Sequence, residues 1–327
     1  MKIQTHGNEV EKFIISELQK LRAKSKNLPQ NFEDEIFRLL KTRRFRKYSM
    51  CASLSERIQK AIAYNVSNNQ PINITFLQGS YKLWRLDESP EADWAELFAL
   101  MYYAEWVKPI LSFYKPGVVF DFYVDDWIME KLSNYRRDEI ISYQNSFQKI
   151  MDFVMSYCSK NLHYKITTVS SQYSSEDEFW DKLRTAVEKW KHFEVIKLDK
   201  AAIEMIDLNY RPMPNEVLSA LWREKNMQLH DAYSAMEDRL RYRKMEGKIL
   251  AMPHHYTGSN DRLFVGSTKD SIIKYWIGVG ALRLRNESFV PTILSPSQLA
   301  NTEFSIYDVR IEGLSAENFK TIRILES

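Results

Sequence analysis

Three short polar segments follow expected strands, and their side chains have the chemistry to bind a small ligand or move a proton. Segment 78–82 carries amide, hydroxyl and ammonium groups, segment 125–127 carries two adjacent carboxylates, and segment 170–173 carries hydroxyls and an amide. In an open parallel sheet, ligands bind beyond the carboxyl ends of the strands. If the preceding strands are parallel, the three segments meet in one crevice.

The two adjacent carboxylates, Asp125 and Asp126, each allow two interpretations. Asp125 stands where a helix is expected to begin, and aspartate commonly caps the first turn of a helix. Asp126 either points into the crevice or lies solvated in the first turn, where the helix dipole favours negative charge. The sequence leaves both alternatives open for both residues.

A second titratable cluster, Pro253-His254-His255-Tyr256, follows another expected strand. Adjacent side chains on an extended segment point to opposite faces, so the two histidines do not suit one metal ion. No third ligand accompanies them at the spacing of a metal site, and we expect no metal. One of them could be a general base, because imidazole titrates near neutral pH. A loop histidine without a chemical role is the alternative.

Two groups of basic residues have both a structural and a binding interpretation. A long helix expected at 215–246 carries a polar stripe with Arg223 and Arg241, either a solvated face or the wall of an anion site. Basic residues at 41–47 end an expected helix, where positive charge suits the dipole. Contacts with nucleic-acid phosphates are the alternative for that cluster.

The hydrophobic periodicity predicts an α/β fold with a doubly wound, mostly parallel sheet. Strands are expected at 72–77, 118–124 and 164–169, and helices at 93–114, 125–132, 138–157 and from Ser174 or Ser175 to residue 190. Helices at 8–25, 31–47 and 53–65, the last with Ser53 as N-cap and Glu56 in a capping box, form an N-terminal layer. Short strands at 249–252, 262–265 and 281–284 form an antiparallel or mixed C-terminal region. Residues 1–70 are thus predicted to pack on a main domain of residues 71–327.

The composition narrows the class of protein. The 327 residues carry a net charge of +3, which does not by itself indicate nucleic-acid binding. No run approaches the roughly 20 apolar residues of a membrane span, and residues 1–7 lack the apolar core that a signal peptide would have. The two cysteines, Cys51 and Cys158, are expected to be reduced thiols of a cytoplasmic protein. Dinucleotide-binding, phosphate-loop and nucleophile-elbow motifs are absent, which disfavours a redox dehydrogenase, an NTPase and a serine hydrolase. We expect no cofactor.

Over residues 55–300 the order of segments resembles the isocyanide (isonitrile) synthases. That family includes the enzymes of the paerucumarin/pyoverdine-cluster pathway and fungal dityrosine-precursor proteins. The likeness is carried by the strand 72–77, Lys115-Pro116-Gly117 before the strand 118–124, Asp125-Asp126-Trp127-Ile128-Met129, Tyr143-Gln144, Pro253-His254, and Trp276-Ile277-Gly278-Val279.

The resemblance implies an enzyme of specialised metabolism with two small-molecule substrates. The family condenses the amine of an amino acid with ribulose 5-phosphate, whose carbonyl carbon becomes the isonitrile carbon. This chemistry requires a proton donor or acceptor and cations that hold a phosphate. By resemblance, the proton-transfer candidates are Asp125, Asp126 and His254. The candidates for substrate contact are Gln78, Lys82, Arg223, Lys274, Trp127 and Trp276.

Two other functions remain open from the sequence. The family has glycine where this chain has Asp126 and commonly has histidine where it has Ile277. A divergent small-metabolite enzyme or binding protein of the same fold is therefore one alternative. A nucleic-acid or protein-binding module that uses the basic residues 41–47 is the other. The sequence predicts neither an oligomeric state nor the substrate side chain.

Overall fold

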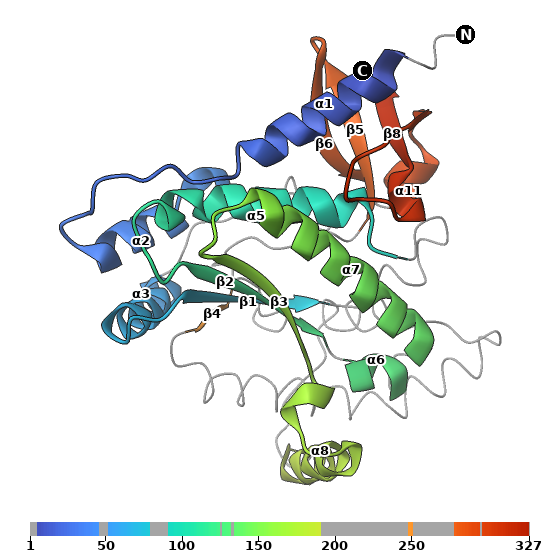
Figure 1. Ribbon diagram of the computed structural model, residues 1–327. Helices are drawn as coiled ribbons and strands as arrows, with labels where there is room; N and C mark the ends of the chain where they lie inside the picture. Colours follow the sequence, from blue (N-terminus) through green and yellow to red (C-terminus); the bar gives the residue numbers. More distant parts are fainter. Residues whose placement is uncertain are drawn as a thin grey trace.

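The computed structural model describes residues 5–45, 52–78, 91–124, 126–131, 134–190, 248–250, 278–294 and 296–326. Within these ranges the chain forms two four-stranded sheets with helices packed around them (Figure 1). No helix in the described ranges has the length and apolar character needed to cross a membrane.

The first sheet is parallel throughout. Its strands are β1 (Ile72–Gln78), β2 (Val118–Val124), β3 (Leu162–Thr168) and β4 (Lys248–Leu250), in the order β3-β2-β1-β4. The prediction of three parallel strands is confirmed. The strand at 249–252 was expected in an antiparallel or mixed C-terminal region, whereas β4 belongs to the main sheet and pairs with β1 in parallel. Strand direction depends on the connection before the strand, which a three-residue apolar run does not reveal.

One face of this sheet is apolar and packs against two long helices, α5 (Trp94–Leu111) and α7 (Arg137–Tyr157) (Figure 1). Alternate residues of the strands point to that face. The Phe120 ring lies 6.3 Å from that of Trp106 on α5, and the Phe122 ring lies 5.1 Å from that of Phe147 on α7. Helices on both faces, as a doubly wound sheet requires, stay a prediction.

The ends of α5 and β2 follow local sequence signals. Asp93 caps α5, and its carboxylate accepts from the Ala95 N–H at 2.7 Å while Glu96 accepts from the Asp93 N–H at 2.6 Å, a capping box. Gly117 ends the turn that leads into β2 and has φ of 80°, a conformation that favours glycine. A Cβ there would lie 1.8 Å from the carbonyl oxygen of Asn161.

Short helices form the N-terminal part: α1 (Thr5–Gln19), α2 (Phe32–Leu40), η1 (Arg43–Phe45) and α3 (Ala52–Ser67). Two boundaries differ from the predictions. The α2 helix ends at Leu40 rather than at residue 47, and a separate turn, η1, lets Phe45 pack on the ring of Tyr102 at 5.1 Å. Since α3 already begins at Ala52, Ser53 is not its N-cap, and Glu56 pairs with Lys60 at 2.7 Å.

The C-terminal sheet is mixed, as predicted for this region. Its strands are β5 (Val279–Arg285), β6 (Ser288–Leu294), β7 (Ser305–Asp308) and β8 (Thr321–Glu326), in the order β6-β5-β8-β7. Only β5 was predicted, from residues 281–284. The β5–β8 pair is parallel and the other pairs are antiparallel. Two short helices, α11 (Pro296–Ala300) and η3 (Glu317–Phe319), complete the region.

The second sheet packs on the start of α5. The Trp94 indole N–H donates to the Thr321 carbonyl at 2.7 Å, and a Cβ on Gly280 would lie 2.3 Å from the Trp94 Cβ. This close approach places the C-terminal strands beside the N-terminus of α5. The predicted helix 215–246 and strand 262–265 lie outside the described residues, and the division into residues 1–70 and 71–327 stays a prediction.

Candidate functional site at the carboxyl edge of the parallel sheet

The strands β1, β2 and β3 end together. In the register of the sheet, Gln78 pairs with Val124 and Val124 pairs with Thr168, so the segments that follow all leave the same edge. This is the edge at which open parallel sheets bind ligands. The described parts of the second and third segments are α6 (Asp126–Lys131) and the turn η2 (Ser170–Gln172).

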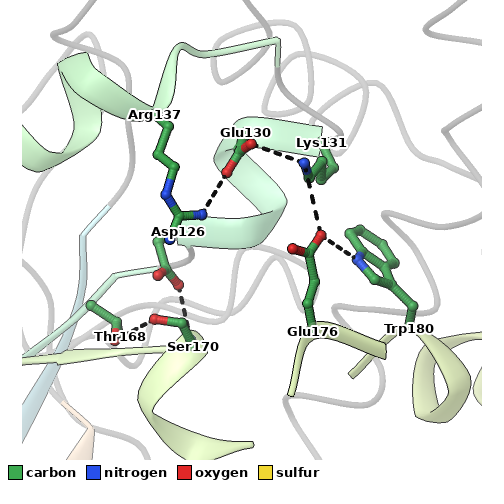
Figure 2. A network of polar contacts seen from close by, with 8 residues as sticks. All are labelled: Asp126, Glu130, Lys131, Arg137, Thr168, Ser170, Glu176 and Trp180. Atoms are coloured by element: carbon green, nitrogen blue, oxygen red, sulfur yellow. Dashed lines mark hydrogen bonds and ion pairs between the residues drawn. The ribbon is translucent and has the colours of Figure 1, made fainter. Parts of the chain in front are cut away.

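Asp126 connects these two segments directly. Its Oδ1 accepts a hydrogen bond from the Ser170 backbone N–H at 3.0 Å (Figure 2). The Asp126 side chain is half-buried and lies in the first turn of α6. The carboxylate therefore points across the edge toward the end of β3 rather than away into solvent.

Hydroxyl groups fix the backbone just beyond β3. The Thr168 Oγ1 shares a hydrogen bond with the Ser170 Oγ at 2.9 Å (Figure 2). It also accepts from the Ser171 N–H at 3.1 Å. The Ser171 hydroxyl donates to the Thr168 carbonyl at 2.8 Å. These bonds hold a turn of polar side chains beside the Asp126 carboxylate.

Trp127 anchors α6 to the helix α8 (Glu176–Trp190). Its side chain is 6% exposed, and its ring lies 5.3 Å from that of Phe179 and 6.3 Å from that of Tyr173. Aromatic packing of this kind positions the helix that carries Asp126. The predicted contact of Trp127 with substrate stays a prediction.

A chain of charged contacts continues along the same edge. The Arg137 guanidinium donates to Glu130 at 3.0 Å, the Lys131 ammonium donates to Glu130 at 2.9 Å, and Lys131 lies 3.8 Å from Glu176 (Figure 2). The Trp180 indole N–H donates to Glu176 at 2.9 Å. The network ties α6 to the starts of α7 and α8.

The pKa of Glu130 is lowered by this network. Partial burial alone would raise the pKa, but hydrogen bonds and charge interactions with Lys131 and Arg137 outweigh that effect. A carboxyl whose pKa is lower in the folded state contributes stability at pH above its unfolded pKa. That contribution is lost as the pH falls through the folded pKa, below the usual value of 4.5.

Glu130→Gln is therefore expected to lower the free energy of unfolding near pH 7 and to lose this effect in acid. The pairs are largely exposed, so the loss is about 1 kcal/mol or less. Urea unfolding of both proteins from pH 7 to pH 3 measures it. A difference between the two proteins that stays constant over this range would show that the Glu130 charge contributes nothing.

The cap of α8 confirms the prediction that Ser174 or Ser175 starts this helix. The Ser175 hydroxyl accepts from the Glu178 N–H at 3.1 Å, and the Ser174 N–H donates to the Glu178 carboxylate at 2.8 Å. Hydrogen bonds from Lys182 and Ser174 lower the pKa of Glu178 to about 2. The cap fixes where α8 begins relative to the Phe179 ring against Trp127.

Sequence reasoning missed an ionic pair on the sheet itself. Asp121 lies in the middle of β2 with 1% exposure, and the Lys165 ammonium of β3 lies 3.0 Å from its Oδ2. The signal was a single carboxylate within an otherwise apolar strand. Charged side chains are almost never fully buried unless they are paired, so this aspartate required a partner.

Of the predicted site residues, Asp126 and Trp127 are the two whose side chains the structure describes. Gln78 is the last residue of β1, and only its backbone is described. The remaining predicted residues lie outside the described ranges: Asp125, His254, Lys82, Arg223, Lys274 and Trp276. Among the described residues, no group of three potential metal ligands converges.

The basic residues 41–47 make contacts within the protein where they are described. Arg44 pairs with Glu105 at 2.9 Å, and the Tyr102 hydroxyl donates to the Arg44 carbonyl at 3.2 Å. The Lys41 ammonium lies 4.8 Å from the centre of the Phe37 ring. These contacts favour the structural interpretation of the cluster. Arg46 and Lys47 lie outside the described residues.

Comparisons with known proteins establish the fold but no family. No family model matches the chain, and no curated protein sequence matches it. The crystal structure of the PvcA protein from Pseudomonas aeruginosa is similar, with a TM-score of 0.60 and 15% sequence identity. The match covers 90% of this chain and 100% of that one. The chain thus has an α/β fold with a parallel sheet that PvcA shares.

Proposed function

We propose that this protein is an isonitrile-synthase-like enzyme of specialised metabolism that condenses the amine of an amino acid with ribulose 5-phosphate. The observation that supports it best is the likeness of its fold to that of PvcA over 90% of this chain. The resemblance of the segments to that family adds to it, as does the Asp126 carboxylate at the carboxyl edge of the parallel sheet, which accepts from the Ser170 N–H at 3.0 Å.

In the proposed reaction, Asp126 transfers a proton between the two substrates. Condensation of an amine with a ketone carbonyl forms an imine and releases water, and a positioned acid/base speeds both proton transfers. A carboxylate that accepts one backbone N–H retains further acceptor positions on its two oxygens. Asp126 therefore can take a proton from the attacking amine and return it to the departing water, with Asp125 and His254 proposed as its partners.

Cations and planar side chains complete the proposed site. Lys82, Arg223 and Lys274 are proposed to bind the substrate phosphate or carboxylate through charge-assisted hydrogen bonds. Gln78, Trp127 and Trp276 are proposed to contact the substrates. We also propose that the reaction takes place in the cytoplasm.

The Cys158 side chain is a buried free thiol. Burial raises its pKa to about 12, which makes the thiol unreactive.

A thermal-shift titration with ribulose 5-phosphate, alone and with single amino acids, tests this proposal. A ligand present at about 100 times its Kd stabilises the folded state by about 2.7 kcal/mol, which raises the melting temperature by a few degrees. Unphosphorylated ribulose and inorganic phosphate are the matched controls. If no phosphosugar shifts the melting temperature, the proposed substrate is wrong.

A divergent metabolite-binding protein of the same fold is the second candidate. The family has glycine at the position of Asp126, so this carboxylate is not part of the family pattern. Its hydrogen bond with the Ser170 N–H joins α6 to η2, which gives Asp126 a structural role without any catalysis. Both points favour the second candidate. Binding of ribulose 5-phosphate without any product, from every amino acid offered, would favour this candidate over the enzyme.

A further inference from the structure

We infer that a row of polar side chains across the middle of the parallel sheet binds a polyhydroxylated small molecule. The polar row consists of Asn73 and Thr75 on β1, Asp121 on β2 and Lys165 on β3. Thr75 pairs in register with Asp121, and Asp121 pairs with Lys165, so the three lie side by side on one face. Asn73, two residues before Thr75, lies on the same face.

The face that carries the polar row is opposite to the apolar face under α5 and α7. Phe120 and Phe122 flank Asp121 in the strand, point to the other side and are fully buried. A sheet that only needed a second apolar layer would carry apolar residues here too, as buried parallel strands usually do. The polar row therefore departs from what packing alone requires.

Burial within the polar row changes from one strand to the next. Thr75 is 5% exposed and Asp121 is 1% exposed, whereas the Lys165 side chain is 48% exposed. The Lys165 ammonium still reaches Asp121 Oδ2 at 3.0 Å. The row thus runs from a buried end at β1 to an end that is open to solvent at β3, through which a small molecule can enter.

Two buried atoms of the row lack a hydrogen bond. The Thr75 Oγ1 and the Asn73 Oδ1 are buried and have no partner among the described residues. More than nine-tenths of buried polar groups in proteins do have one, and an exception calls for a water molecule, an ion or a ligand. Two such atoms on one strand, next to the buried Asp121 carboxylate, mark a place that a polar molecule would complete.

The hydrogen-bond donors and acceptors of the polar row indicate which class of ligand it would bind. The Asn73 carbonyl oxygen and the Asp121 carboxylate accept hydrogen bonds, the Thr75 hydroxyl both donates and accepts, and the Lys165 ammonium donates. A polyol matches this set, because each of its hydroxyls donates and accepts. An apolar molecule would leave the atoms unpaired, and a bare anion would meet the negative charge of Asp121.

The position of the polar row fits the substrate of the proposed enzyme. Thr75 lies three residues before Gln78, so the row lies about 10 Å from the carboxyl edge along the strands. The polyol would then be the carbon chain of the ketose phosphate, with its phosphate nearer the edge. The identification of the polyol as the ketose phosphate rests on the proposed function. The inference that the polar row binds a polyol does not.

Thr75→Val tests the inference, with Thr75→Ser as the matched control. Valine keeps the shape of threonine and removes only the hydroxyl, whereas serine keeps the hydroxyl. The measurements are the melting temperature without ligand and the Kd for ribulose 5-phosphate and for ribitol, by calorimetry. We expect the valine variant to melt no lower than the wild type and to bind about tenfold more weakly, while the serine variant binds within about threefold.

Each outcome separates this inference from the proposed function. If the wild type and Thr75→Val bind ribulose 5-phosphate equally, the inference fails and the proposed function stands. If the wild type binds only ribitol and the valine variant loses it, the inference stands and the proposed function fails. Binding of neither compound overturns both. A clearly lower melting temperature for the valine variant would show that the hydroxyl already has a partner, which also overturns the inference.

Discussion

Asp126→Asn is expected to reduce the turnover of an amino acid with ribulose 5-phosphate by about 100-fold or more, because a general acid/base typically contributes a factor of this size. Asparagine has the same shape, and its carbonyl oxygen can still accept the Ser170 N–H that Asp126 Oδ1 accepts at 3.0 Å. The fold and the binding of substrate should therefore be preserved. Initial rates and the melting temperature of both proteins measure the two effects.

Glu130→Gln is the matched control for this variant. It removes a carboxylate from the same helix, α6, but Glu130 contacts Arg137 and Lys131 and has no assigned part in the reaction. We expect its turnover to equal that of the wild type within about a factor of two. Equal turnover of Asp126→Asn and wild type would remove Asp126 from the mechanism.

Phe120→Ala is expected to lower the free energy of unfolding by about 3–5 kcal/mol, since it leaves a large cavity in the core. The Phe120 side chain is fully buried at the centre of the apolar face of the sheet. Its ring lies 5.5 Å from that of Tyr164, 5.6 Å from that of Phe76 and 5.8 Å from that of Tyr103. Urea unfolding followed by circular dichroism measures the loss.

Val119→Ala provides the comparison, because Val119 is the neighbour of Phe120 and points to the opposite face of the strand. It is only half-buried, so its truncation should cost about 1 kcal/mol. Similar losses for the two variants would contradict the assignment of the apolar face and the register of β2.

The parallel sheet could be predicted because its strands carry strong local signals. The run 118–124 is almost wholly apolar and lies between Gly117 and the acids that follow, and it coincides with β2. The caps at Asp93 and Ser175 also follow from residue type and spacing. The early end of α2 at Leu40 carries no such signal, because it depends on Phe45, which packs on Tyr102 instead of continuing the helix.

The C-terminal sheet was harder to predict, since most residues of β6 and β7 are not buried. Along β6 and β7, exposed and buried residues alternate irregularly, and Val290 and Ile306 are exposed although they are apolar. Pro291 interrupts the pattern of β6, where a proline is tolerated at the edge of a sheet. The pairing of these strands depends on tertiary contacts with α5 that no local pattern contains.

One contact of the candidate site could be predicted from the sequence and another could not. The meeting of Asp126 with Ser170 follows from the rule that parallel strands end at one edge, and the bond between them agrees with it. The pairing of Asp121 with Lys165 could not be predicted, because the partner lies on another strand and its register is set by the whole sheet. A buried aspartate in the sequence signals only that some partner exists.

The most direct test of the proposed reaction is incubation of the protein with tyrosine or tryptophan and ribulose 5-phosphate labelled at the ketose carbonyl carbon, followed by mass spectrometry. The proposed condensation predicts a new product that contains the amino acid and the labelled carbon and that is absent with Asp126→Asn. Full recovery of both substrates, under conditions in which ribulose 5-phosphate is bound, would contradict an isonitrile-synthase-like reaction on these substrates.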